Sequence, residues 1–205
     1  MPERDDYASE IARIKERIDS DPDPNALFKA TENLREEDFT LLGKFIQAYC
    51  VADLHARRVV DALRHAALGA NERFASRLQD AQVFSKLFEI AAKLPPSDIK
   101  DGLIKAAQTV ELHRIHRHNF AHWAVRRVVG HNVLIMFTKN ARESERRDGE
   151  VLQPDELKYG LVPIEPLIEE LDKLEGHAKY FDEATFYIEK NLEAYKAFFV
   201  KNPIS

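Results

Sequence analysis

One segment of the sequence gathers basic and histidine residues in a chain that is acidic as a whole. The chain has 35 Asp and Glu residues and a formal net charge of −5, yet no acidic residue lies between Glu111 and Glu143. A reserved stretch of positive potential indicates a site for phosphate or another anion, although a solvated basic face that balances acidic neighbours is the alternative. The segment contains Arg114, Arg117, Arg126, Arg127, Lys139, Arg142 and the histidines His113, His116, His118, His122 and His131.

Helical periodicity predicts which side chains of this segment face the core. A helix over about 98–129 places an apolar face toward the core, and His118, His122 and Arg114 fall on that face with Arg117 at its margin. Because a buried arginine needs a partner, we expect Glu111 to pair with Arg114. The side chains on this face should therefore be partly withdrawn from bulk water, or line a groove or a subunit seam. The residues that define the face are Ile104, Ala107, Ile115, Ala121, Val125, Val128 and Val129, whereas His113, His116 and Trp123 point elsewhere.

Three chemistries fit histidines and arginines in this arrangement. His118 and His122, four residues apart, could chelate zinc from one helix, but the segment lacks the Glu of a zinc-protease motif and a clear third ligand. We therefore expect no metal and no cofactor. The second chemistry is acid–base catalysis on a phosphodiester, with histidine moving protons and arginine holding phosphate oxygens. The third possibility is structural, with histidines bonded to backbone carbonyls and arginines paired with acids.

The sequence Arg117-His118-Asn119-Phe120-Ala121-His122 resembles the signature of the HEPN superfamily of helical domains, an Arg followed by four to six residues and a His. Pairs with similar spacing also occur at Arg58/His65 and Arg126/His131. Only Arg117/His122 combines a polar residue after the Arg, an Ala before the His and a late helix. The resemblance covers this motif and the helical layout of about 36–200, and it leaves 1–35 unexplained.

This resemblance implies a metal-independent endoribonuclease that acts as a homodimer in a toxin, defence or stress setting, with a possible antitoxin or other regulatory partner. His122 would transfer protons while the RNA 2′-OH attacks its own phosphate, and Arg117 would stabilise the anionic phosphorane. The alternative within the superfamily is a non-catalytic dimeric scaffold that binds RNA, nucleotide or a partner protein. Ala124 stands where some toxin members carry a modified Tyr. His118 and Asn119 would be supporting residues, and Arg114, Trp123, Arg126 and Arg127 would contact RNA or another anion.

The remaining patterns predict a mainly α-helical protein, a bundle of about five helices with one β-hairpin. We expect a hairpin within about 132–162, immediately before the C-terminal helix, and a division into an N-terminal helical arm (1–35) and a helical domain (36–205). Gly69 and Gly130 should end helices, and Gly176 could interrupt the last one. The expected helices are 6–19, 36–68, 71–94, 98–129 and about 163–200, and the expected strands are 132–139 and 157–163.

Other features bear on location. Cys50 is the only cysteine, so no intramolecular disulfide can form, and the first ten residues lack the apolar stretch of a secretion signal. The longest purely apolar run, Val133–Phe137, is too short to span a membrane. The sequence therefore predicts a cytoplasmic protein with no membrane segment.

Overall fold

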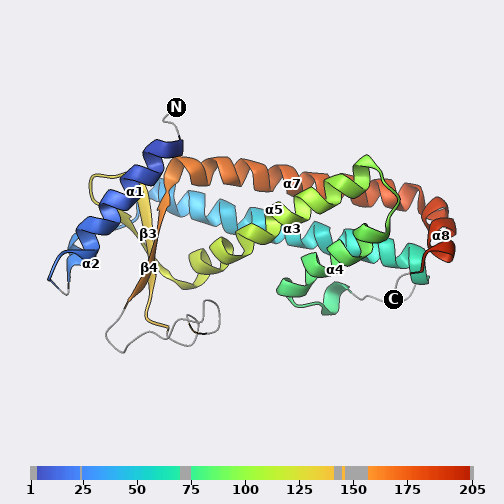
Figure 1. Ribbon diagram of the computed structural model, residues 1–205, viewed down its shortest axis with the longest axis horizontal. Helices are drawn as coiled ribbons and strands as arrows, with labels where there is room; N and C mark the ends of the chain where they lie inside the picture. The colour runs from blue at the N-terminus through green and yellow to red at the C-terminus, as the bar shows by residue number, and fades with distance from the viewer. Residues whose placement is uncertain (1–3, 24, 70–74, 141–144, 146–156, 204–205) are drawn as a thin grey trace. The chain divides into compact units, whose positions relative to one another are not determined.

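A computed structural model of the chain describes residues 4–23, 25–69, 75–140, 145 and 157–203. These residues are mainly helical and include a small four-stranded antiparallel sheet (Figure 1). The helices are α1 (Arg4–Asp19), α2 (Ala26–Lys29), α3 (Glu36–Leu68), the 3-10 turn η1 (Ala75–Arg77), α4 (Asp80–Lys93), α5 (Asp98–His122), α7 (Ile164–Lys190) and α8 (Leu192–Lys201). The strands are β1 (Thr31–Glu32), β2 (Ala124–Val128), β3 (Val133–Thr138) and β4 (Lys158–Pro163).

The chain forms two compact units, and each long helix contributes to both. Unit 1 comprises Met1–Gly43 and His118–Glu170, and unit 2 comprises Lys44–Arg117 and Leu171–Ser205. The boundary in α5 falls between Arg117 and His118, inside the predicted motif. Within the described residues, no helix is both long enough and apolar enough to cross a bilayer.

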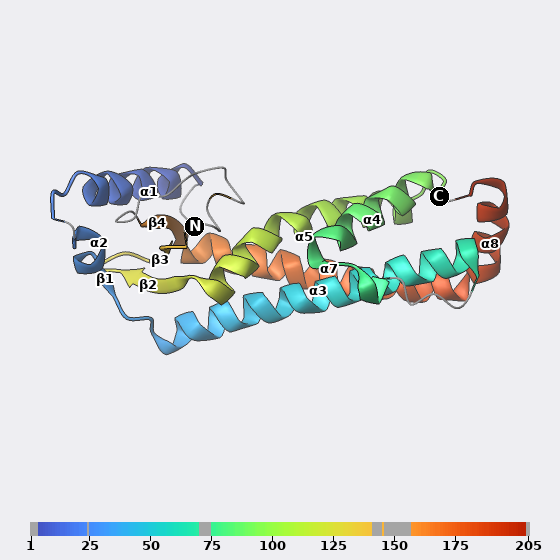
Figure 2. The same cartoon turned by 90° about the horizontal axis from the view of Figure 1, so that it is seen from below.

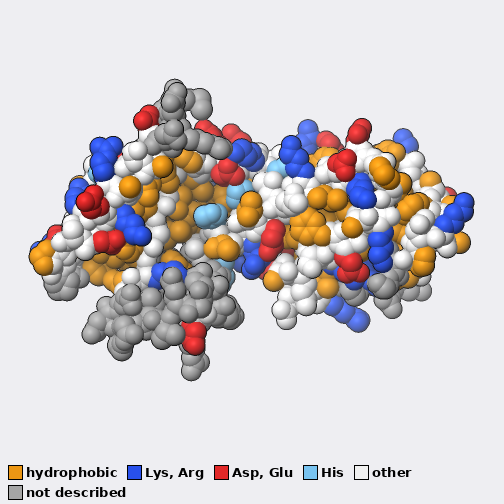
Figure 3. Space-filling view, in the orientation of Figure 1, with side chains coloured by type: hydrophobic (Ala, Val, Ile, Leu, Met, Phe, Trp, Pro, Cys, Tyr) orange, Lys and Arg blue, Asp and Glu red, His pale blue; other side chains and the backbone are white. Residues whose placement is uncertain are grey.

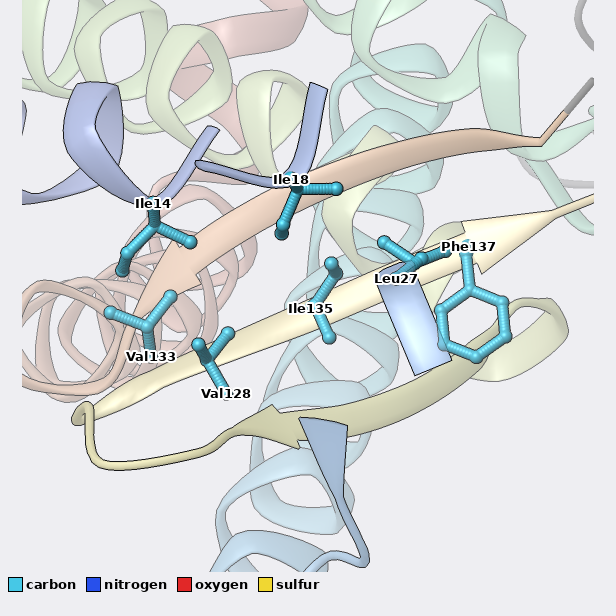
Figure 4. Packing of buried hydrophobic residues seen from close by; sticks show 7 residues of the cluster. All are labelled: Ile14, Ile18, Leu27, Val128, Val133, Ile135 and Phe137. Carbon is cyan, nitrogen blue, oxygen red and sulfur yellow. The ribbon is translucent and has the colours of Figure 1, made fainter. Parts of the chain in front are cut away.

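Unit 1 is built on the sheet, whose strand order is β1-β2-β3-β4. Helix α1 covers one face of it, as Figure 2 shows. Ile14 and Ile18 of α1 point toward alternate residues of β3, which is the two-residue period expected of a strand (Figure 4). Every residue from Val133 to Phe137 is buried, so both faces of β3 are covered. The core cluster consists of Ile14, Ile18, Leu27, Val128, Val133, Ile135 and Phe137.

The turn between β2 and β3 depends on a glycine. Gly130 has φ +75°, a conformation that other residues rarely adopt, and the His131 amide donates to the Val128 carbonyl at 3.2 Å. The strands on either side pair antiparallel, with Val125 opposite Met136 and Arg127 opposite Leu134. Gly130 therefore reverses the chain between two strands.

Unit 2 is a bundle in which aromatic side chains join the helices. The ring of Phe84 in α4 lies 6.5 Å from Tyr49 in α3 and 6.4 Å from Phe181 in α7. Phe45 of α3 meets the His113 ring of α5 edge to face at 5.5 Å. Aromatic rings at these separations pack favourably in cores, and all five of these side chains are buried.

Arg57 of α3 joins the rest of unit 2 to the segment before α4. Its guanidinium donates to Asp53 at 2.7 Å, to the carbonyls of Ala75 and Leu78 at 2.7 Å each, and to Asp80 at 3.0 Å. Arg57 thus donates to one carbonyl within η1, that of Ala75, and to one directly after it, that of Leu78. An arginine with several hydrogen-bonded partners is a structural residue.

Several sequence predictions are confirmed. The mainly helical class is correct, α3 has the predicted bounds 36–68, and Gly69 follows it with φ +87°. The predicted strands correspond to β3 and β4, which pair antiparallel. Most of the segment that would join these strands in a hairpin lies outside the described residues, as does part of the predicted helix 71–94.

Finer details are wrong. About five helices were predicted, but the described residues contain seven α-helices, because the short α2 follows α1 and the last predicted helix is divided into α7 and α8. The sheet has four strands, because residues 124–128, predicted as the end of a helix, form β2, and Thr31–Glu32 form β1. Gly130 therefore lies in a strand turn and does not end a helix. The last helix is interrupted at Asn191, not at Gly176, which lies within α7.

Candidate functional site

The candidate motif occupies the last turns of α5. The Trp123 amide donates to the Asn119 carbonyl at 2.8 Å, and β2 begins one residue later. His122 is thus the last helical residue, immediately before the chain enters the sheet. Arg117 stands five positions earlier on the same helix.

Arg117, at the end of the unit 2 part of α5, is half-buried against α3. Its guanidinium carbon lies 5.9 Å from the centre of the Tyr49 ring, and Nη2 is 4.0 Å from Cys50 Sγ. These are a cation–π contact and a weak hydrogen bond. The Nε atom is buried and has no hydrogen-bond partner within the described residues. Arg117 thus contacts protein without an ion pair in the described part of the chain.

Asp53 and Tyr49 provide the electrostatic surroundings of Arg117. Burial raises the pKa of Asp53, and this effect outweighs the lowering by Arg57 and Arg117. Burial, with the negative charges of Asp53 and Glu111, also raises the pKa of Tyr49. Its phenol therefore keeps its proton at neutral pH. The sequence analysis assigned a site role to neither residue. A signal was present nevertheless, because polar groups recur every four residues along an otherwise apolar stretch of α3, at Tyr49, Asp53 and Arg57.

In unit 1, the two histidines of the motif lie together. The rings of His118 and His122 are 4.4 Å apart, centre to centre, with an angle of 47° between their planes. His122 is exposed, His118 is half-buried, and the intervening Asn119 is buried. An exposed imidazole beside a second one can exchange protons with a bound substrate.

Of the other four predicted anion-binding residues, two form ion pairs, Arg127 and Arg114, and two are half-buried, Trp123 and Arg126. Arg127 is buried and paired with Asp38 at 2.7 Å, so its charge is already compensated. Arg114 pairs with Glu111 at 2.8 Å, as predicted. Arg126 and Trp123 are half-buried near the start of the sheet. The basic segment therefore supplies structural ion pairs as well as candidate site residues.

The predicted face of α5 is wrong in part. His113 is buried and His122 is exposed, the reverse of the prediction, and Ile115 is 52% exposed. The cause is the end of the helix at His122: the valines that fixed the predicted face belong to β2 or follow it. His116 is exposed, as expected. The buried face of α5 is formed by Leu103, Ala106, Ala107, Val110, His113 and Phe120.

The face drawn in Figure 3 is mixed in charge. Figure 3 shows histidine side chains reaching the drawn face among basic and acidic side chains, without a single broad basic patch. Among the described residues, no three His, Cys, Asp or Glu side chains are placed to hold a metal ion. Comparison of the chain with protein-family models, with curated proteins and with solved structures finds no match.

Proposed function

We propose that this protein is a HEPN-like, metal-independent endoribonuclease. In this proposal His122 takes the proton of an RNA 2′-OH, whose oxygen attacks the adjacent phosphorus, and Arg117 stabilises the phosphorane anion. The P–O5′ bond breaks, and His122 returns the proton to the departing 5′ oxygen. The products are a 2′,3′-cyclic phosphate and a 5′-OH, and water is not consumed.

The observation that supports the proposal most directly is the exposure of His122 together with the contacts of Arg117. His122 is exposed and 4.4 Å from the His118 ring, and Arg117 has no ion pair within the described residues. A catalytic histidine needs access to substrate, and a phosphate-binding arginine needs N–H groups that are not already hydrogen-bonded to a carboxylate. His118 and Asn119 would orient the pair. The proposal includes a homodimer in the cytoplasm with a toxin, defence or stress role, for which an antitoxin or another regulatory protein is a candidate partner.

RNA cleavage by purified protein in EDTA tests the proposal. We expect wild type to release fragments with 2′,3′-cyclic phosphate ends, and His122→Ala and Arg117→Ala to lose cleavage by about 10²–10⁴-fold. The matched control is His116→Ala, because His116 is an exposed histidine of the same helix outside the motif. Unchanged cleavage by EDTA-treated His122→Ala protein would contradict the proposal.

A second candidate function is a scaffold that binds RNA, nucleotide or protein without chemistry. The contact of Arg117 with Tyr49 and Cys50 favours it, since this arginine lies half-buried on α3. Such a scaffold would bind RNA less tightly as salt rises and release no product. Arg117→Ala would then weaken RNA binding, whereas His122→Ala would leave it unchanged.

A further inference from the structure

Six charged residues of unit 2 form a polar cluster that joins α3, α4 and α5. The acidic members are Asp53, Asp80 and Glu111, and the basic members are Arg57, Arg114 and Arg117. The cluster has three charges of each sign. The three arginines differ in whether a carboxylate of the cluster is hydrogen-bonded to them, and Arg117 is the one that differs from the other two.

Two of the three arginines have carboxylate partners at hydrogen-bond distance. Arg57 Nε is 2.7 Å from Asp53 Oδ2, and Arg114 Nε is 2.8 Å from Glu111 Oε1. Of the three, only Arg117 has no such bond to a residue that the structure describes, although its charge acts on Asp53 and lowers that residue's pKa. Arg57 is shared by two carboxylates, Asp53 and Asp80, so the three negative charges of the cluster are balanced only when Arg117 is included.

Asp53, Arg117 and the neighbouring Tyr49 each have a buried polar atom without a hydrogen-bond partner in the described part of the chain. Asp53 Oδ1 can accept hydrogen bonds, whereas Arg117 Nε and the Tyr49 hydroxyl can donate them, and none has a hydrogen-bond partner within the described residues. Tyr49 is only 2% exposed, and its ring faces the Arg117 guanidinium. Buried polar atoms in this situation are costly unless they interact with one another or with water.

We propose that Asp53 and Tyr49 are positioning residues for Arg117. Asp53 supplies the opposing charge and Tyr49 the flat surface against which the guanidinium rests, so that Arg117 is fixed relative to α3 instead of turning freely on α5. The consequence for RNA rests on the proposed function: a fixed guanidinium meets the phosphorane in one orientation. Loss of the fixation should lower the rate of chemistry more than the affinity for RNA.

The first test needs no activity. Carboxyl ¹³C NMR of the full chain follows the titration of Asp53, which is faced by Arg57 from its own helix, Asp80 from α4 and Arg117 from α5. We expect Arg117→Gln to raise the pKa of Asp53 and the matched change Arg114→Gln to leave it unaltered. A pKa of Asp53 that is the same in wild type and Arg117→Gln would overturn the proposal.

The second test is kinetic and uses two carboxylates that share Arg57. Asp53→Asn keeps an oxygen for Arg57 but removes the negative charge that interacts with Arg117, whereas Asp80→Asn weakens the contact with Arg57 and removes a negative charge near Asp53 while Asp53 itself stays in place. We expect Asp53→Asn to lower kcat for RNA cleavage by about 10–100-fold with KM changed less than about threefold, and Asp80→Asn to leave kcat within about twofold. Equal losses in the two variants would contradict the positioning role.

The two tests separate the failure of this inference from the failure of the proposed function. If wild type cleaves no RNA, the proposed function is wrong, and the Asp53 titration alone decides whether Arg117 is held by Asp53. If wild type cleaves RNA and the titration does not respond to Arg117→Gln, the function stands and the positioning role is wrong.

Discussion

Arg127 in unit 1 and Arg117 in unit 2 come from the same basic segment, ten residues apart, but they differ in burial and in the groups that contact them. The Arg127 side chain is 8% exposed, pairs with the 1% exposed Asp38 at 2.7 Å, and also donates to Asn132. Arg117 is half-buried, contacts the Tyr49 ring and the Cys50 thiol, and has no ion pair among the residues that the structure describes. The comparison teaches that an arginine's role depends on whether the fold places a carboxylate at hydrogen-bond distance from it.

The largest expected effect concerns the compensated arginine. Asp38→Ala leaves Arg127 buried without its counter-charge and removes the acceptor of the Arg35 amide, so the free energy of unfolding should fall by about 3–5 kcal/mol. Urea unfolding followed by fluorescence of Trp123, the single tryptophan, reports on unit 1. As a control, Glu32→Ala removes the exposed partner of Arg35 and should cost under about 1 kcal/mol. A similar small loss for Asp38→Ala would remove the basis of the comparison.

The next effect concerns Arg57, the residue of unit 2 that corresponds to Arg127. Arg57→Met removes hydrogen bonds to two carboxylates and two carbonyls and should lower the free energy of unfolding by about 2–3 kcal/mol, measured by circular dichroism. Arg58→Met is the matched control, because Arg58 pairs with Asp182 at the surface and should contribute under about 1 kcal/mol. If the two variants were equally stable, Arg57 would not be the structural arginine of unit 2.

The smallest effect is a pH dependence at Asp53. Its folded-state pKa is raised by burial, so the native protein binds a proton more readily than the unfolded chain, and stability from this group falls as pH rises from about 3.8 through the raised pKa. Asp53→Asn lacks this titration. The stability difference, wild type minus Asp53→Asn, should therefore decrease as pH rises through that window, measured by urea unfolding at several pH values. An increase would mean that Arg57 and Arg117 outweigh burial.

The fold was predictable where local patterns and tertiary contacts agree. The periodicity of α3 and the apolar run of β3 gave their positions almost to the residue. Residues 124–128 were not predictable in this way, because their strand depends on pairing with β3 in a register that places Arg127 opposite Leu134. The two-residue strand β1 carries no alternation that sequence analysis could detect.

The candidate site was predictable only along one helix. The spacing of Arg117 and His122 is visible in the sequence, and so is the nearness of Glu111 to Arg114. The partners on α3 were not, because Tyr49 precedes Arg117 by 68 residues and local spacing says nothing about contacts at that separation. The burial of Arg127 depends in the same way on Asp38, which is 89 residues away in sequence.

One paired measurement tests the contrast between the two arginines most directly: RNA cleavage and unfolding of Arg117→Met beside Arg127→Met. The account predicts that Arg117→Met loses cleavage by at least about 100-fold while its free energy of unfolding changes by less than about 1 kcal/mol. Arg127→Met should lose about 3–5 kcal/mol of stability, and the molecules that remain folded should cleave RNA at nearly the wild-type rate. If both variants lost cleavage only in proportion to the fraction unfolded, Arg117 would have no role of its own and the account would be contradicted.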